Sequence, residues 1–206
     1  MNDKEQEVVE FISNNLNAII ENIAHESVEA YQYLKMEFDK TDVSENYFFQ
    51  FVFRSFYGLD SAGLKDDFKK KYFKLLQENK GNPSPDFRSI IKQLYEIKNI
   101  KEKESLQVSF TSKLIHTLQH NFPIYDSKVA RLMKFPYLPS SLYIEDRISG
   151  YLEQITELKK LYACIKKHIG ENLFTEFDNK FKTVISDEKK IDFILWSAGK
   201  LKNKLN

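Results

Sequence analysis

Two residues near the middle of the chain, Lys113 and Asp126, have the types and the spacing that amine and carboxylate chemistry needs. Lys113 lies in a run whose apolar residues recur every three or four positions, so we expect a helix that begins at Ser105 and carries Lys113 at the border of its apolar face. A lysine that is partly buried there loses hydration, which lowers the pKa of its amine and frees it to attack a carbon atom. The alternative is a structural lysine whose stem packs on apolar neighbours.

Asp126 follows a turn at Asn121–Pro123, where the proline ends the first helix. Its position predicts an N-cap for a second helix that runs through Met133. A carboxylate held ionised by helix amides can stabilise positive charge on a reacting sugar, whereas a plain capping role is the alternative. Residues 105–133 are thus expected to form a helix, a turn and a second helix, around which the rest of the chain is organised.

The segments SFTSKLI, which contains Lys113, and PIYDSKV, which contains Asp126, resemble the helix-hairpin-helix base-excision DNA glycosylase superfamily. The nearest branch is that of the 8-oxoguanine glycosylases. Members of the superfamily carry a catalytic lysine just after a hairpin and then a Val/Ile-x-Asp-Thr/Ser-x-Val segment, which Ile124–Val129 matches. More loosely, Phe48–Leu76 and the terminal IDFILWSAGK resemble uncharacterised bacterial proteins with the same fold.

The resemblance implies a DNA N-glycosylase that excises a flipped-out modified purine such as 8-oxoguanine. In this hypothesis Lys113 attacks C1′ of the deoxyribose and Asp126 supports the transition state, and the lysine implies an additional strand-cleaving lyase activity. Ser109 and Ser112 stand in the place of the family's hairpin and are expected to face DNA. Beside Asp126 in the sequence, Lys128, Arg131 and Lys134 are predicted to contact phosphates.

Two other functions remain open. The residues in the hairpin position include no glycine, although a close approach of backbone to phosphate favours residues without a Cβ, and the Lys–Asp spacing is shorter than in the family. With the nearly neutral net charge of +1, these features favour a catalytically silent DNA- or protein-binding module of the same fold. A helical interaction protein without a nucleic-acid role is the third possibility.

Composition excludes several classes of site. One cysteine, Cys164, leaves no internal disulfide and no cysteine-based metal centre, and a small packed residue is the expected role. His116 and His120 are four residues apart, as metal ligands on a helix can be, but the sequence suggests no third ligand. We therefore expect no metal and no cofactor. The chain has no apolar run of membrane-spanning length and no signal peptide, so we expect no membrane association and a cytoplasmic location.

The remaining pattern predicts an all-α fold of about nine or ten helices in one domain, residues 1–206, with two lobes around the 105–133 element as an alternative. We expect one helix or two in series over residues 4–37, an aromatic buried helix at Tyr47–Tyr57 capped by Ser44, and further helices at Leu64–Glu78 and from Pro85. After an aromatic linker, Phe135–Pro139, the pattern predicts helices at Ser141–His168, Glu171–Val184 and Ile191–Leu201. The oligomeric state is not encoded in any recognisable pattern.

Overall fold

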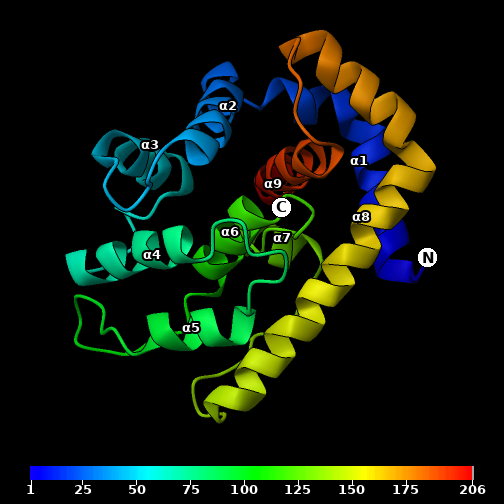
Figure 1. Cartoon of the computed structure of the whole chain (residues 1–206). Helices are drawn as coiled ribbons and strands as arrows, with labels where there is room; N and C mark the ends of the chain where they lie inside the picture. Colours follow the sequence, from blue (N-terminus) through cyan, green and yellow to red (C-terminus); the bar gives the residue numbers. More distant parts are fainter. Residues whose placement is uncertain (206) are drawn as a thin grey trace. The chain divides into compact units, whose positions relative to one another are not determined.

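The computed structural model describes the backbone of residues 1–205 and the side chains of residues 1–202. Within residues 1–205 it contains nine α-helices and no β-strand, which confirms the predicted all-α fold (Figure 1). None of the helices in this part of the chain combines the length and the apolar character that a membrane crossing needs. The helices are α1 (Asp3–Glu21), α2 (His25–Lys40), α3 (Tyr47–Tyr57), α4 (Asp66–Glu78), α5 (Phe87–Tyr95), α6 (Val108–Leu118), α7 (Ser127–Leu132), α8 (Ile144–Phe181) and α9 (Asp187–Leu205).

The chain divides into two compact units. The insert unit comprises residues 26–120, and the split unit comprises residues 1–25 together with the chain from residue 121 onward. The boundary at 120/121 falls inside the 105–133 element, so its first helix belongs to the insert unit and its second helix to the split unit.

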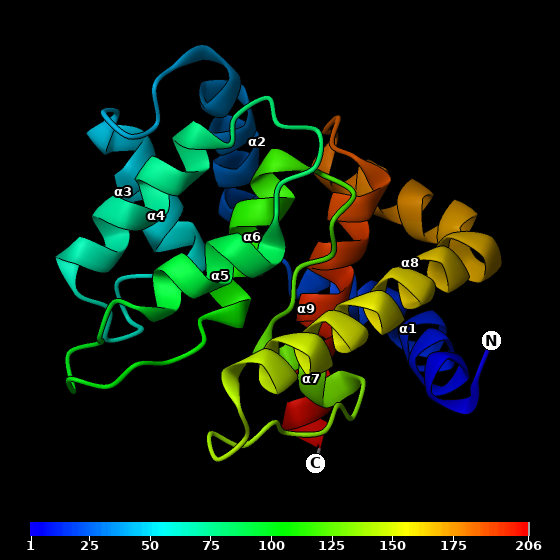
Figure 2. The ribbon, with the colours of Figure 1, turned by 60° about the horizontal axis from the view of Figure 1, so that its bottom comes forward.

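The insert unit has a core of aromatic rings. Helix α4 packs on α5 and α6, which lie beside it in both views (Figures 1 and 2). Phe53 on α3 is fully buried, and its ring centroid lies 5.7 Å from that of Tyr72 and 5.5 Å from that of Phe73, both on α4. The Tyr72 hydroxyl donates a hydrogen bond of 2.9 Å to the carbonyl of Phe110 and so fixes the first turn of α6 to α4. This bond satisfies a polar group that burial would otherwise penalise.

The split unit is built around α9, which packs on α1, α7 and α8 (Figure 2). Its interior is mainly aliphatic, and the apolar stripe of α1 contributes Ile12 and Ile19, both fully buried. Ser197 on α9 donates a hydrogen bond of 2.7 Å to the carbonyl of Ile19, which ties the two helices together. Apolar burial therefore supplies the main stabilisation, and isolated polar contacts set the register.

The predicted start of α3 at Tyr47 is confirmed, but its predicted cap and the predicted starts of α5 and α6 are wrong. Helix α3 is capped by Asn46, whose side chain accepts from the Phe49 amide, while Ser44 is engaged with Asp42. Asp86, one residue after Pro85, caps α5. Helix α6 begins at Val108, after Gln107, and is therefore shorter than a helix that starts at Ser105. The competition among neighbouring Ser, Asn and Asp residues decides such starts.

Two predictions about helix extent and burial are also corrected. Residues 144–181 form one continuous helix, α8, in place of two helices divided after His168. Gly150 lies within this helix, and a Cβ at this position would lie 2.8 Å from the Leu138 Cδ1. Helix α3 is not buried on nearly all sides, since Phe48 and Phe51 are 63% and 57% exposed. Only the stripe that includes Phe53 faces the core, as expected for a helix at the surface of a unit.

The two N-terminal helices match the prediction of helices in series, with a break at residues 22–24. Asn2 and Glu5 form a capping box at the start of α1, each side chain accepting from the other residue's amide at 2.9 Å. Gly58 ends α3 with a φ of +73°, a left-handed conformation that favours glycine. For the last helix, Ser186 and Asp187 were predicted as the cap and Ile191–Leu201 as the helix. The helix begins at Asp187, and the Ser186 hydroxyl accepts from the Lys189 amide at 3.4 Å.

Candidate functional site

Lys113 lies in the insert unit and is more deeply buried than a border position implies. Its side chain is 8% exposed, on a helix whose neighbouring residues Thr111 and Ser112 are also buried. Helix α6 is therefore enclosed on more than its apolar stripe, and this is why the helical wheel alone underestimated the burial of the amine. A buried ammonium must exchange its water shell for protein partners.

The partners of the Lys113 Nζ are oxygen atoms and aromatic rings. Nζ donates to the Ser109 Oγ at 3.0 Å, one turn earlier on α6, and to the carbonyl of Tyr57 at 3.4 Å. It also lies 4.9 Å from the ring centroid of Phe110 and 5.7 Å from that of Tyr57. Tyr57 is the last residue of α3, so the amine sits at the carbonyl end of that helix. Such an end attracts a cation.

The remaining polar residues of α6 are occupied within the insert unit. Ser112 is fully buried, and its hydroxyl donates to the carbonyl of Ser109 at 3.0 Å. His116 is 1% exposed; its ring centroid lies 6.2 Å from that of His120 and 6.3 Å from that of Tyr31. Among the residues that the structure describes, no group of three or more His, Cys, Asp or Glu side chains could hold a metal ion.

A small hollow lies beside this region of the insert unit. Its free volume is about 10 Å³, which is the room that a single water molecule needs. Lys113 does not line it. A purine is larger than this hollow, so the lining residues would have to move before a purine could enter. The lining residues are Tyr31, Leu34, Lys35, Phe38, Phe53, Tyr57, Thr117 and His120.

Asp126 lies in the split unit and is the N-cap of α7, as predicted. One carboxylate oxygen accepts a hydrogen bond of 2.9 Å from the Lys128 amide. Helix α9 approaches α7 closely at this point: a Cβ on Gly199 would lie 2.8 Å from the carbonyl oxygen of Lys128 and 2.9 Å from its Cβ. Real Cβ atoms do not come that near to backbone, so only glycine fits, and the contact holds the first turn of α7 in place.

The basic residues after Asp126 are engaged within the split unit. The Lys128 Nζ lies 5.1 Å from the ring centroid of Trp196, which Lys200 approaches at 4.4 Å. Arg131 is exposed, and its Nε donates to the carbonyl of Ser127 at 3.2 Å. The Lys134 Nζ donates to a carboxylate oxygen of Glu7 at 2.6 Å. The predicted basic face therefore keeps an exposed arginine, while its two lysines contact other residues of the same unit.

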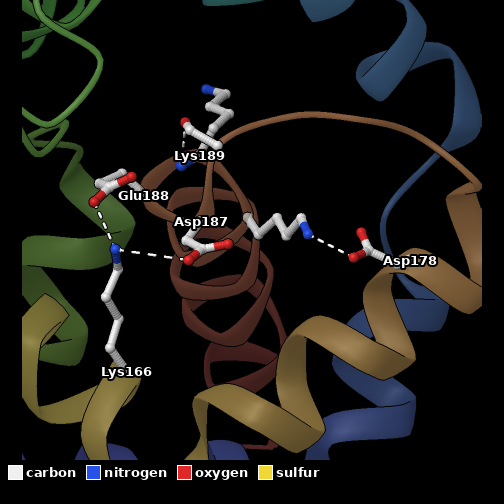
Figure 3. Close-up of polar contacts among 7 residues, drawn as sticks. Lys166, Asp178, Asp187, Glu188 and Lys189 are labelled. Atoms are coloured by element: carbon white, nitrogen blue, oxygen red, sulfur yellow. Dashed lines mark hydrogen bonds and ion pairs between the residues drawn. The ribbon is translucent and has the colours of Figure 1, made fainter.

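Ion pairs at the start of α9 form a second polar cluster, which the sequence reading did not single out (Figure 3). Lys166 on α8 lies 2.6 Å from Glu188 and 3.8 Å from Asp187, and Lys190 lies 2.6 Å from Asp178. These pairs join α8 to α9. The run DEKKID at residues 187–192 was the available signal, but alternating charges are also typical of a solvated helix face.

The most deeply buried member of this cluster is Lys189, which is 1% exposed. Its Nζ donates to Asp192 at 2.6 Å, one turn later on α9. Burial lowers the pKa of Lys189, and Asp192 opposes that shift by favouring the charged form. The cluster resembles an active site in its pKa perturbation, but a lysine so enclosed offers no route for a substrate. We interpret it as a structural ion pair.

Lys113 and Asp126 thus belong to different units, and each has a defined local setting. Their convergence on one pocket stays a prediction. Searches of family models, curated proteins and solved structures found no match to this chain.

Proposed function

We propose that this protein is a lysine-dependent DNA N-glycosylase that removes a modified purine such as 8-oxoguanine. The observation that carries the proposal is the setting of Lys113, whose Nζ lies within a shell of two oxygen atoms and two aromatic rings at 8% exposure. A buried amine is a stronger nucleophile than a hydrated ammonium once its proton has been released. The pattern SFTSKLI–PIYDSKV supplies the link to DNA chemistry.

In the proposed reaction, the neutral Lys113 amine forms an Nζ–C1′ bond while the glycosidic bond to the purine breaks. The purine departs with the bonding electron pair and takes up a proton. Opening of the sugar ring then gives an imine between Nζ and C1′, and loss of a proton from C2′ expels the 3′-phosphate. Asp126 would offset the positive charge on the sugar, and the Ser109 hydroxyl would accept a hydrogen bond from Nζ.

The test is borohydride trapping on a duplex that contains 8-oxoguanine opposite cytosine. Reduction of the imine should give a covalent protein–DNA adduct with the wild type and none with Lys113→Gln, because an amide forms no imine. Lys70→Gln is the matched control, since Lys70 is an exposed lysine of the same unit. Equal trapping of wild type and Lys113→Gln would place any amine chemistry elsewhere.

The second candidate is a catalytically silent DNA- or protein-binding module of the same fold. It is favoured by the position of the Lys113 Nζ at the carbonyl end of α3, where an ammonium is stabilised by about 0.3–1 kcal/mol and the free amine is not. In that case Lys113 is a helix-capping residue. Wild-type protein that binds DNA, yet releases no base from any modified-purine duplex and gives no adduct, would favour this candidate over the enzyme.

A further inference from the structure

The segment between α7 and α8, residues 133–143, exposes two tyrosine rings in the split unit. Tyr137 is 79% exposed and Tyr143 is 84% exposed, and the nearby Leu142 is 42% exposed. Large apolar side chains at such exposure lose hydration energy that burial would recover. A single exposed aromatic side chain is common on protein surfaces, but two such tyrosines in one short segment are a candidate binding feature.

The segment is anchored by several contacts to the unit beneath it. Phe135 donates its amide to the carbonyl of Ala130 at 2.9 Å, and its ring stacks on Tyr125 with an angle of 7° between the planes. The Gln154 side chain donates to the carbonyl of Pro136 at 2.9 Å. Leu138 fills the space that Gly150 leaves by lacking a Cβ.

These contacts lie on both sides of Tyr137, and Pro136 and Pro139 further restrict the backbone. The backbone that carries Tyr137 therefore needs less ordering on binding, which removes part of the entropic cost of association. A rigid frame that presents exposed aromatic rings is a feature of binding surfaces.

Charge indicates the kind of partner. Residues 127–149 contain four basic residues, Lys128, Arg131, Lys134 and Arg147, and two acidic residues, Glu145 and Asp146. Lys134 is paired with Glu7 at 2.6 Å, so we assign the contact with a negatively charged partner to Arg131. Arg131 lies on the helix that leads into the segment, and its guanidinium is exposed. An aromatic surface beside an exposed arginine suits a polyanion that carries flat rings.

We propose that residues 133–143 are a DNA-docking segment, in which Tyr137 and Tyr143 stack on bases exposed where a duplex is opened and Arg131 contacts the backbone. The inference rests on the proposed function for its choice of DNA, and it names the surface that would hold the opened duplex. Stacking on an aromatic ring tolerates any base, because every base has a π face. The segment therefore recognises an opened duplex, and discrimination among bases is left to another surface.

The experiment measures binding of a fluorescent duplex that contains one tetrahydrofuran abasic analogue, by polarisation over a range of salt concentrations. This analogue has no aldehyde, so binding does not require Lys113. The double variant Tyr137→Ala/Tyr143→Ala should bind at least about fivefold more weakly, which corresponds to about 1 kcal/mol for one lost stack. Its salt slope should equal that of the wild type because no charge is removed.

Three control variants complete the design. Tyr137→Phe/Tyr143→Phe should retain wild-type affinity, since the ring is kept. Tyr47→Ala removes a tyrosine of the insert unit that is 76% exposed, and it should leave binding unchanged. Arg131→Ala should flatten the salt slope by about 0.9, the contribution of one phosphate contact on duplex DNA.

The outcomes separate this inference from the proposed function. A double alanine variant that binds as tightly as the wild type overturns the docking segment, even where borohydride trapping succeeds. Tyrosine-dependent binding with no trapping supports the segment and contradicts the enzyme. No binding by the wild type overturns both proposals. Tyrosine-dependent sedimentation with vesicles of anionic phospholipid, without DNA binding, would overturn the segment in favour of a lipid surface.

Discussion

The two units of this protein are stabilised in different ways. In the insert unit, Phe49, Phe53, Tyr72 and Phe73 are each at most 1% exposed and contact one another through their rings. In the split unit, aliphatic side chains fill the core, ion pairs join α8 to α9, and a buried ion pair lies within α9. Aromatic packing depends little on pH or salt, whereas ion pairs depend on both.

This difference bears on the two candidate catalytic residues. Lys113 lies in the aromatic unit, in which its amine contacts ring faces, a hydroxyl and a carbonyl oxygen. Asp126 accepts a hydrogen bond from the Lys128 amide in the unit that carries most of the buried charge.

The largest expected effect tests the aromatic core. Phe53→Ala removes a ring that contacts Phe49, Tyr57, Tyr72 and Phe73, and we expect a loss of about 3–5 kcal/mol in the free energy of unfolding. The measurement is urea denaturation followed by circular dichroism. Trp196, the only tryptophan, lies in the split unit, so its fluorescence should shift less than the circular dichroism transition. A loss below about 1 kcal/mol would contradict the role of this ring.

The matched change in the split unit is Asp192→Ala, which leaves Lys189 buried without its carboxylate. We expect a loss of about 3–5 kcal/mol, reported by Trp196 fluorescence during urea denaturation. Lys189→Met/Asp192→Leu should recover most of this loss, because an apolar pair of similar volume avoids burying charge. A double variant no more stable than Asp192→Ala would show that the ion pair itself is required.

A smaller effect is expected at the contact between α7 and α9. Gly199→Ala should cost about 1–3 kcal/mol of stability, because the new Cβ would lie within 3.0 Å of three Lys128 atoms, two of them backbone. Gly150→Ala is the control: its Cβ meets only the end of the Leu138 side chain, which can rotate. That variant should be neutral or more stable, since alanine favours a helix over glycine by about 1 kcal/mol. Equal melting temperatures for the two variants would contradict the close approach.

The smallest effect is expected at Glu7. Hydrogen bonds from Lys134 and then from Lys202 lower the pKa of Glu7 from its ordinary value of 4.5 to about 2. Because the pKa is lower in the folded protein, this contribution to stability is present above pH 4.5 and is lost as the pH falls from about 4.5 to about 2.

The Glu7 side chain is 45% exposed, so solvent screens the interaction and we expect less than about 1 kcal/mol. Glu7→Gln should flatten the dependence of the melting temperature on pH in that window. Glu10→Gln, on the same helix, is the control. An unchanged pH dependence in Glu7→Gln would contradict the assignment.

The sequence predicted the local features of the fold well. Helical periodicity identified the all-α class, and capping chemistry correctly placed Asp126 at the start of α7 and Gly58 at the end of α3. It failed where several residues compete for one role, as with Ser44 and Asn46, and where tertiary packing overrides a local signal, as at Gly150 in α8. Such outcomes depend on contacts between residues distant in the chain.

The candidate site was only partly predictable, because its setting also depends on contacts between residues distant in the chain. Residue type and spacing singled out Lys113, but its 8% exposure results from packing against the end of α3, which no local pattern encodes. The pairing of Lys134 with Glu7 joins residues more than one hundred positions apart, and no local pattern indicates that this part of the basic face is neutralised within the protein.

The most direct test of the proposed chemistry is to identify the lysine that carries the trapped sugar. After borohydride reduction on an 8-oxoguanine duplex, nuclease and protease digestion followed by mass spectrometry should place the deoxyribose remnant on the peptide that contains Lys113. Asp126→Asn, which keeps a good N-cap and should change stability by less than about 1 kcal/mol, should lower the rate of base release by about 10²–10³. A remnant on any other lysine, or full activity in both Lys113→Gln and Asp126→Asn, would contradict the proposal.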